Sequence, residues 1–282
     1  MTTIYTRTEL RSFLEAEKAQ SRQIGLVPTM GALHMGHLSL VERAIQENDR
    51  VIVSIFVNPT QFNNPDDLDK YPQNLEADLD ILNIYLPKVV VFAPAIEEMY
   101  SRRVEAGNYD LGRLDQVMEG SYREGHFQGV ATIVETLLRT TAPDRAYFGE
   151  KDYQQLLIIK KLVRDKGLRV TICPCPIVRE PNGLAMSSRN SRLSKRLRER
   201  AGIIFQTLQS ANEQFGTKSV TEIVDWVHKV FRNDPDFKLE YFSIADANTL
   251  IPIDKKHNNK QSRAFIAVYA GDIRLIDNLA LN

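Results

Sequence analysis

The sequence predicts an α/β protein: a Rossmann-like, doubly wound parallel sheet followed by a smaller C-terminal α+β domain. Up to about residue 177, short apolar segments rich in β-branched residues alternate with amphipathic segments of helical period, the pattern of βαβ units. After about residue 190, two helical segments precede segments in which apolar and polar residues alternate, as in an antiparallel sheet with one covered face. We therefore expect domains over 1–177 and 178–282.

In the first domain, the apolar segment 23–29 ends near Pro28, and Leu38, Val41 and Ile45 then share one face of a helix. Residues 50–59 are nearly all apolar, as in a parallel strand buried on both faces. Further strands are expected at 88–94, 144–149 and 168–177, and further helices at 75–86, 129–139 and 153–167. In the second domain we expect helices at 192–215 and 220–233 and strands at 238–247 and 263–278.

Composition narrows the function classes. Lys plus Arg and Asp plus Glu each total 36 in 282 residues, so no overall field favours nucleic acid or an acidic membrane as partner. The N-terminal sequence lacks the apolar core of a signal peptide, and no apolar run approaches the ~18 residues of a membrane span. We expect a cytoplasmic protein. Its two cysteines, Cys173 and Cys175, are expected to be reduced thiols on a buried strand, since their spacing suits neither a disulfide nor a complete zinc site.

Two of the five histidines lie together in the segment LVPTMGALHMGH, directly after the first strand. His34 and His37 are three residues apart at the start of a helix, where free N–H groups favour anions, and Gly36 leaves room for a ligand to approach the backbone. Imidazoles at that position can donate to a phosphate chain. A capping role stays open, and a zinc site would need a third ligand, for which His126 is the nearest candidate.

Three other polar motifs also follow strands. They are NPTQF (58–62), GEKDYQQL (149–156) and AMSSRNSRL (185–193), and a further polar loop, EGSYREGHFQGV (119–130), contains Arg123 and His126. Each motif alone is weak evidence for a functional site. In doubly wound sheets, however, ligands bind beyond the carboxyl ends of the strands, near the point where the strand order reverses. The shared placement therefore predicts one polar site at that edge.

Together, these motifs resemble the pantoate–β-alanine ligase family, within the wider group of nucleotidyltransferases with a His-x-Gly-His signature. The resemblance covers nearly the whole chain, through YPQNLEAD (71–78) and GHFQGVATIV (125–134) to GDIRLIDN (271–278). It implies ATP-dependent ligation of pantoate and β-alanine to pantothenate, through a pantoyl adenylate, with release of AMP and pyrophosphate. It also implies Mg²⁺ as companion of ATP and a homodimer.

The resemblance also assigns site residues. It implies catalytic roles for His34, His37, Lys151 and Arg189, with His37 at the position usually given to a proton donor, and pantoate binding by Gln61 and Gln155, with Gln61 also near β-alanine. The residues implied in ATP binding are Met30, Gly31, His34, Gly36, His37, Gly149, Glu150, Lys151, Asp152, Val178, Met186, Ser187, Ser188 and Arg189. Lys151 would contact phosphate, Asp152 the ribose and the backbone of Val178 the adenine.

The charges of the reaction agree with this assignment. A carboxylate and a triphosphate repel each other, and the implied histidines, Lys151, Arg189 and Mg²⁺ would offset that repulsion. The ligands of Mg²⁺ are not identified by the sequence, although Asp78 is one candidate. Water must be kept from an adenylate, and segments 62–74 and 183–191 are candidate closing loops. Glu124 and Thr60 depart from the usual family residues, proline and methionine.

Two other functions remain open from the sequence. A plain adenylyltransferase would move AMP onto a phosphate-bearing acceptor, against which the paired neutral glutamines Gln61 and Gln155 argue. A regulatory nucleotide-binding module would have lost turnover, against which the intact His34, His37, Lys151 and Arg189 argue.

Overall fold

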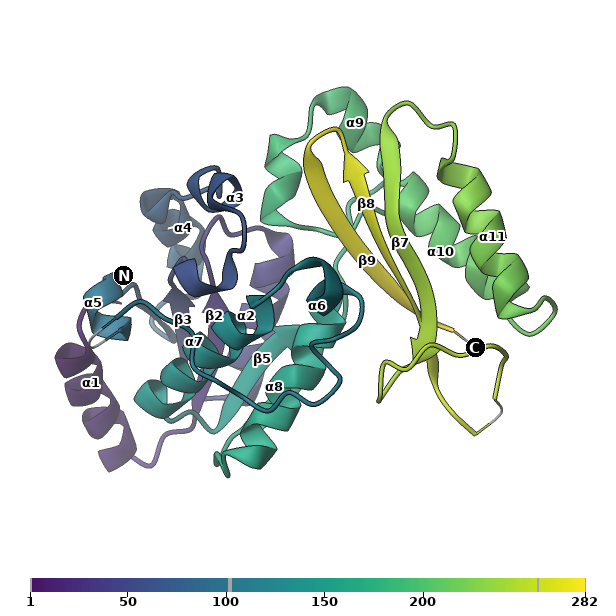
Figure 1. The fold of residues 1–282 in the computed structure, drawn as a ribbon. Helices are drawn as coiled ribbons and strands as arrows, with labels where there is room; N and C mark the ends of the chain where they lie inside the picture. Colours follow the sequence, from purple (N-terminus) through teal and green to yellow (C-terminus); the bar gives the residue numbers. More distant parts are fainter. Residues whose placement is uncertain (1, 101–102, 258, 282) are drawn as a thin grey trace.

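The computed structural model describes residues 2–100, 103–257 and 259–281, and shows a parallel sheet with helices on both faces beside a smaller antiparallel sheet (Figure 1). The parallel sheet has six strands in the order β1-β4-β3-β2-β5-β6. The strands are β1 (Thr3–Ile4), β2 (Ile24–Thr29), β3 (Arg50–Ile55), β4 (Val89–Phe92), β5 (Arg145–Gly149) and β6 (Thr171–Cys175). The predicted doubly wound α/β class is confirmed.

Two apolar clusters hold the helices to the parallel sheet. Helices α2 (Met35–Glu47) and α4 (Leu75–Leu82) cover one face, and α1 (Arg7–Ala19), α7 (His126–Thr141) and α8 (Tyr153–Asp165) cover the other. Alternate residues of a strand belong to different clusters. Val51 and Val53 of β3 pack in the cluster that contains α2, whereas Ile52 packs in the cluster that contains α1, α7 and α8. Burial on both faces is the reason these strands are apolar throughout.

The C-terminal sheet is antiparallel, with β8 (Ser262–Ala270) between β7 (Phe237–Asp246) and β9 (Ile273–Leu281). Helices α10 (Ile203–Gln214) and α11 (Val220–Phe231) pack on one face through an apolar cluster. The opposite face is partly covered as well, because Phe265 and Ala245 pack with Met118 from the N-terminal half of the chain, which contains the parallel sheet. The expectation of a single covered face was therefore incomplete: the second face docks the two halves together.

The structure differs from the sequence expectations at several element ends. The helix expected at 192–215 is divided into α9 (Lys195–Arg200) and α10, and the carbonyls of Arg198 and Glu199, just before the break, accept from Asn182 Nδ2 at 2.7 Å and 3.1 Å. The strands expected at 50–59 and 168–177 are shorter, at 50–55 and 171–175. Helix α1 was not predicted, although a Thr6–Glu9 capping box marks its start.

Short helices also occupy segments for which no element was predicted. They are α3 (Pro65–Asp69), α5 (Ile96–Met99), α6 (Glu119–Tyr122) and the 3-10 turns η1 (Pro59–Gln61), η3 (Glu150–Asp152) and η4 (Ser188–Arg192), whereas the 3-10 turn η2 (Asn83–Tyr85) lies within the helix expected at 75–86. Both cysteines are free and buried in β6, as expected. Among the described helices, none has the length and apolar character that crossing a membrane requires.

The strand order reverses between β2 and β5, since β3, β4 and β1 lie on one side of β2, and β5 and β6 lie on the other. The loop carrying His34 follows β2, and turn η3 follows β5. The fold therefore brings two of the predicted motifs to the switch point, where ligands bind in sheets of this class.

Candidate active site

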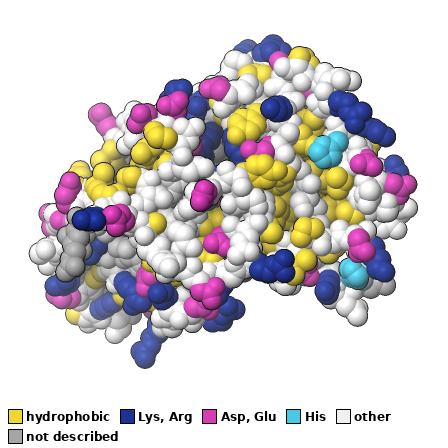
Figure 2. Space-filling view, viewed as in Figure 1, with side chains coloured by type: hydrophobic (Ala, Val, Ile, Leu, Met, Phe, Trp, Pro, Cys, Tyr) yellow, Lys and Arg dark blue, Asp and Glu magenta, His cyan; other side chains and the backbone are white. Residues whose placement is uncertain are grey.

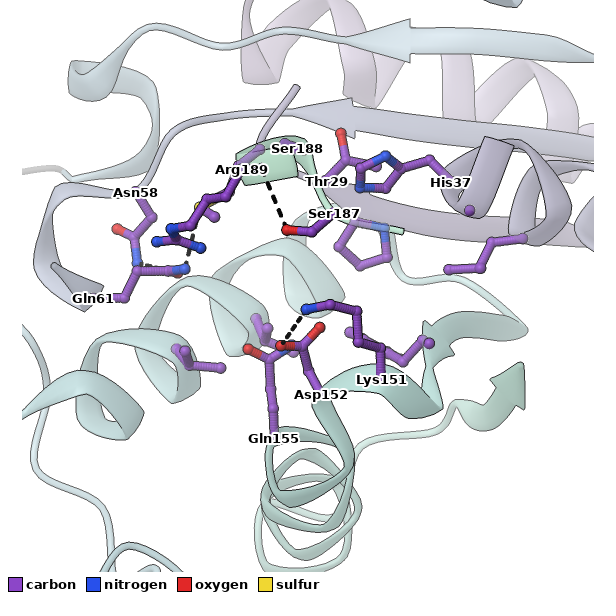
Figure 3. A pocket seen from close by; sticks show the side chains of 18 of the residues that line it. Thr29, His37, Asn58, Gln61, Lys151, Asp152, Gln155, Ser187, Ser188 and Arg189 are labelled. Carbon is purple, nitrogen blue, oxygen red and sulfur yellow. Dashed lines mark hydrogen bonds and ion pairs between the residues drawn. The ribbon is translucent and has the colours of Figure 1, made fainter. Parts of the chain in front are cut away.

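A pocket opens at the carboxyl edge of the parallel sheet (Figure 3). It is lined by most of the predicted site residues, namely Met30, His34, Gly36, His37, Gln61, Gly149, Lys151, Asp152, Gln155, Val178, Met186, Ser187, Ser188 and Arg189. Gly31 and Glu150 do not line it. Gly31 lies against Asp78 with a φ of 80°, and the Glu150 carboxylate is 3.3 Å from Arg263 Nη2.

The two histidines cap α2 reciprocally. The Gly36 N–H donates to His34 Nδ1 at 3.1 Å, and the His34 N–H donates to His37 Nδ1 at 3.3 Å. A backbone N–H only donates, so both Nδ1 atoms are acceptors and each neutral ring carries its hydrogen on Nε2. Capping and function are thus not alternatives here: the cap sets the tautomer that leaves an Nε2–H donor on each ring.

The cap itself requires a glycine at position 36. A Cβ at position 36 would lie 2.8 Å from His34 Cε1 and 2.9 Å from Nδ1. The sequence interpretation, room for a ligand to approach the backbone, therefore missed the nearer cause. Any side chain at this position would push the His34 ring out of its capping bond.

Asp78 holds the loop that precedes the histidines. Its carboxylate accepts from the N–H of Leu33 at 2.7 Å and from that of Ala32 at 3.0 Å, and the residue is 2% exposed. Both oxygens are therefore engaged by backbone, and Asp78 is not among the residues that line the pocket. It orients the loop instead of offering a metal ligand.

Burial keeps the site histidines neutral. Desolvation lowers the pKa of His34 to about 4 and that of His37 to about 3, and in each case the positive charge of Lys151 lowers it further. The pKa of His126 falls to about 3, again through desolvation first and then through Arg123. His37 is therefore a hydrogen-bond donor rather than an imidazolium acid in the ligand-free protein.

These lowered pKa values make the fold sensitive to acid. The unfolded chain takes up a proton on each histidine below its ordinary pKa of about 6.5, whereas the folded chain does so only near pH 3–4. The histidine contribution to stability is therefore complete above pH 6.5 and is lost as the pH falls toward 4. We expect His126→Gln to reduce the slope of unfolding free energy against pH in this window by up to ~1.4 kcal/mol per pH unit. Urea titrations at several pH values measure it, and equal slopes would contradict it.

Turn η3 carries Lys151 and Asp152 between β5 and α8. Lys151 Nζ lies 3.8 Å from Asp152 Oδ1, and the Lys151 side chain is 19% exposed at the pocket, while that of Asp152 is 47% exposed. Gln155 rises beside them from the first turn of α8 (Figure 3). One turn thus presents a cation, a carboxylate and a neutral amide to the same cavity.

Gln61 faces them from η1 across the pocket and is only 9% exposed. Asn58 Nδ2 donates to Gln61 Oε1 at 3.1 Å, and His126 Nδ1 lies 2.7 Å from the Gln61 carbonyl oxygen. Arg123 donates to the other ring nitrogen of His126 at 3.1 Å, so His126 carries its hydrogen on Nδ1 and donates it to Gln61. His126 therefore orients Gln61, and a role as zinc ligand has no support.

Sequence reasoning gave Asn58, Arg123 and His126 only minor weight and missed Tyr71 and Asp67. Tyr71 lines the pocket. Asp67, on α3, accepts from Arg189 Nη2 at 2.6 Å and from Arg192 Nη1 at 3.2 Å. This ion pair joins the two segments predicted as closing loops, 62–74 and 183–191, and no local signal in the sequence indicates it.

The comparisons with known proteins agree with this geometry. The sequence model of the family described as pantoate-beta-alanine ligase matches residues 2–280. The chain belongs to this family. Pantothenate synthetase of Christiangramia forsetii is 53% identical over 95% of both chains, and that of Flavobacterium psychrophilum is 48% identical over 98% of both.

Solved structures support the family membership. The crystal structure of pantothenate synthetase from Thermus thermophilus aligns with a TM-score of 0.90 at 42% identity over 99% of both chains. Pantoate-β-alanine ligase from Francisella tularensis, solved with β,γ ATP and β-alanine, aligns with a TM-score of 0.82 at 38% identity, over 99% of this chain and 97% of that one. The chain is a ligase that joins pantoate and β-alanine with ATP, and the two other functions left open by the sequence fall away.

Proposed function

We propose that this ligase works in two steps at the pocket between β2 and β5. The pantoate carboxylate attacks the α-phosphorus of ATP, which forms pantoyl adenylate and releases pyrophosphate. The β-alanine amine then attacks the acyl carbon, which forms pantothenate and releases AMP. The observation that carries this proposal is the convergence of donors at the switch point: two imidazole Nε2–H groups from α2 and the Lys151 ammonium from η3.

In the first step, the pocket must offset repulsion between two anions. We propose that the Nε2–H groups of His34 and His37, which both line the pocket, donate to the phosphate chain, and that Lys151, across the pocket from His37, adds a positive charge. Ser187 and Ser188 lie beside them at the start of η4. Because the adenylate is itself the activated acyl group, positioning and charge stabilisation account for catalysis without a nucleophilic side chain.

Arg189 is paired with a carboxylate. Its guanidinium is paired with Asp67, at 2.6 Å and 3.3 Å, so contact with a phosphate requires it to share or leave that carboxylate. We propose that the Asp67–Arg189 pair holds the 62–74 and 183–191 segments over the pocket, where they exclude water from the adenylate.

Neutral amides suit the hydroxyl-bearing part of pantoate. Gln61 and Gln155 approach the cavity from opposite elements, and Asn58 and His126 hold Gln61 in place. Each glutamine amide offers both donors and an acceptor without a charge, which is what a hydroxyl group can use. Asp152, 47% exposed beside Lys151, is placed for the ribose hydroxyls of ATP.

Mg²⁺ fits this site as an ion that arrives with ATP. Among the described residues, no group of three His, Cys, Asp or Glu side chains could hold a metal ion. Mg²⁺ commonly keeps several waters and binds phosphate oxygens with one or two carboxylates, so it does not need a protein cage. The ion would be held through the ATP phosphates and its own waters, and would neutralise phosphate charge.

The family resemblance also leads us to propose a homodimer that works in the cytoplasm. We further propose that the two domains divide between residues 177 and 178. Support for that division is that the last strand of the parallel sheet ends at Cys175, whereas the bridge between Arg179 and Ala185 opens the connection to the second half.

The two-step reaction predicts how product formation depends on the substrates. AMP release should require pantoate and β-alanine together, and pyrophosphate release should proceed to about one equivalent per site with pantoate alone. A coupled AMP assay and a single-turnover pyrophosphate assay measure the two. Sustained AMP release without β-alanine, or formation of a dinucleotide, would contradict the mechanism.

A further inference from the structure

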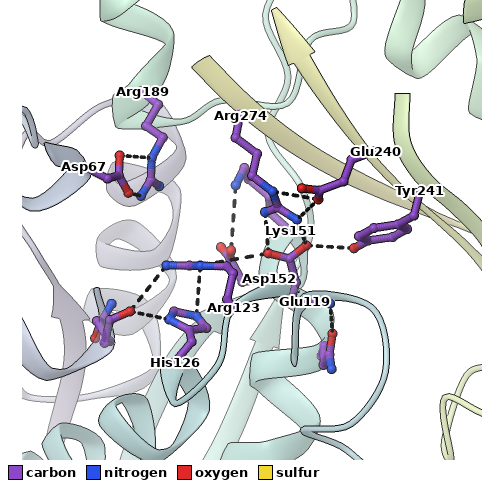
Figure 4. A network of polar contacts seen from close by, with 12 residues as sticks. Asp67, Glu119, Arg123, His126, Lys151, Asp152, Arg189, Glu240, Tyr241 and Arg274 are labelled. Carbon is purple, nitrogen blue, oxygen red and sulfur yellow. Dashed lines mark hydrogen bonds and ion pairs between the residues drawn. The ribbon is translucent and has the colours of Figure 1, made fainter. Parts of the chain in front are cut away.

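The motif GDIRLIDN (271–278) contributes to the family resemblance, yet none of its residues, all of which the structure describes, lines the active-site pocket. It forms most of β9 in the C-terminal half. Two of its polar side chains nevertheless reach toward the first half. Arg274 contacts Glu119 at 2.6 Å, and Asn278 contacts η3 (Figure 4 shows the first of these).

Asn278 makes the contact nearest to the chemistry. Its side-chain amide donates both hydrogens, one to the carbonyl oxygen of Glu150 and one to that of Lys151, each at 2.9 Å. Its Oδ1 accepts from Arg263, and its own backbone N–H donates to Asp277 Oδ1 at 2.8 Å. The residue is 2% exposed, so no water competes for these bonds.

The two carbonyls belong to the two peptide planes that flank the Lys151 Cα. The orientation of those planes defines φ and ψ of Lys151, and with them the direction of its Cα–Cβ bond. A single amide that holds both planes therefore sets the direction in which the Lys151 side chain leaves the turn. The turn is short, three residues of 3-10 helix, and such turns have few internal hydrogen bonds with which to hold this geometry.

We propose that Asn278 is a positioning residue for the nucleotide: from the C-terminal sheet it fixes the Glu150–Asp152 turn, so that Lys151 points into the pocket. The inference rests on the proposed contact between Lys151 and an ATP phosphate. It gives the C-terminal sheet a part in ATP binding although no residue of that sheet lines the pocket.

The test is Asn278→Asp, which keeps the size of the side chain. A carboxylate oxygen would then face two carbonyl oxygens without a hydrogen to share, and the turn would shift. We expect kcat/KM for ATP in adenylate formation to fall at least ~10-fold, while KM for pantoate stays within ~2-fold, since small misplacements at a reacting centre have large effects. Steady-state kinetics with each substrate varied in turn measure the split.

The matched control is Asn182→Asp. Asn182 Nδ2 also donates to two consecutive carbonyls, those of Arg198 at 2.7 Å and Glu199 at 3.1 Å, but these lie in α9, which does not line the pocket. The control should lower the melting temperature and leave KM for ATP unchanged. If Asn278→Asp does not fold, Asn278→Ser removes both donors without adding charge and should show the same split.

Three outcomes overturn or limit the inference. An unchanged KM and kcat for ATP in a folded Asn278 variant overturns it, as does an equal change in the constants for both substrates, which indicates a general structural role. Lys151→Ala separates the inference from the proposed function. If that variant keeps normal ATP kinetics, the role of Lys151 fails; if it loses them while Asn278 variants do not, only the role of Asn278 fails.

Discussion

Replacing His37 by alanine should lower the rate of pantoyl adenylate formation at least ~10²-fold, the scale of losing one important transition-state donor. The structure identifies that donor as Nε2–H, because His37 Nδ1 is occupied by the His34 N–H at 3.3 Å. Rapid-quench measurement of pyrophosphate release in a single turnover isolates this step from product release.

Two isosteric variants separate the cap from the donor. In His37→Asn the side-chain oxygen takes the place of Nδ1, so the cap is kept and the pocket-facing donor is lost. In His37→Gln the amide takes the place of Nε2, so a donor is kept. We expect His37→Asn to form the adenylate as slowly as His37→Ala does. His37→Gln should retain a large part of the wild-type rate.

The His37→Gln variant also shows whether His37 stabilises charge or transfers a proton. Burial lowers the pKa of His37 to about 3, which favours a neutral donor. A glutamine can donate a hydrogen bond but cannot deliver a proton at neutral pH. If His37→Gln is as slow as His37→Ala, His37 transfers a proton and ATP phosphates must raise its pKa; near-normal rates in His37→Ala would remove it from the mechanism.

The second large effect is expected at Gly129, on α7. A Cβ there would lie 2.2 Å from the Thr60 carbonyl oxygen and 2.6 Å from the Gln61 backbone nitrogen. Both atoms are backbone, so η1 and α7 must separate and Gln61 must move. We expect Gly129→Ala to weaken pantoate binding by ~10²-fold, in line with the cost of a 1 Å misplacement, and to reduce stability by ~1–3 kcal/mol through overpacking.

Isothermal titration of pantoate and of ATP, with urea unfolding of the same variant, measures these effects. Thr136→Ala is the control on α7, because its hydroxyl bonds the Thr132 carbonyl of the same helix, at 2.9 Å. Normal pantoate affinity in Gly129→Ala would show that α7 can move away without displacing Gln61. The packing of α7 on η1 would then have no role in pantoate binding.

The distribution of charged side chains on the surface does not by itself favour anionic substrates. Acidic and basic side chains are interspersed over the face seen in Figure 2, in agreement with equal totals of 36 each. Selectivity for anionic substrates therefore depends on groups inside the pocket. We propose that Lys151 and the two imidazole donors, all of which line the pocket, supply it.

Much of the site could be predicted from motifs because those that contain His34, Gln61 and Lys151 lie within a few residues of the ends of β2, β3 and β5. Pro28 and Pro59 lie at or just beyond the ends of β2 and β3, and all strands of a parallel sheet end at one edge. Periodicity predicted the helices for the same reason, since one face of each is apolar. It could not show that the helix expected at 192–215 divides after residue 200, because the side chain that bonds the carbonyls there belongs to Asn182, sixteen residues before Arg198.

By itself, the sequence determined the α/β class, the family and many of the residues that line the pocket. Only the tertiary structure decided how those residues are held. It assigned Nε2–H as the donor on His34 and His37, paired Asp67 with Arg189, and placed Asn278 on the carbonyls beside Lys151. The physical reason is range: local patterns encode periodicity and strand ends, whereas the last two contacts join groups more than a hundred residues apart, whose meeting depends on how the whole chain packs.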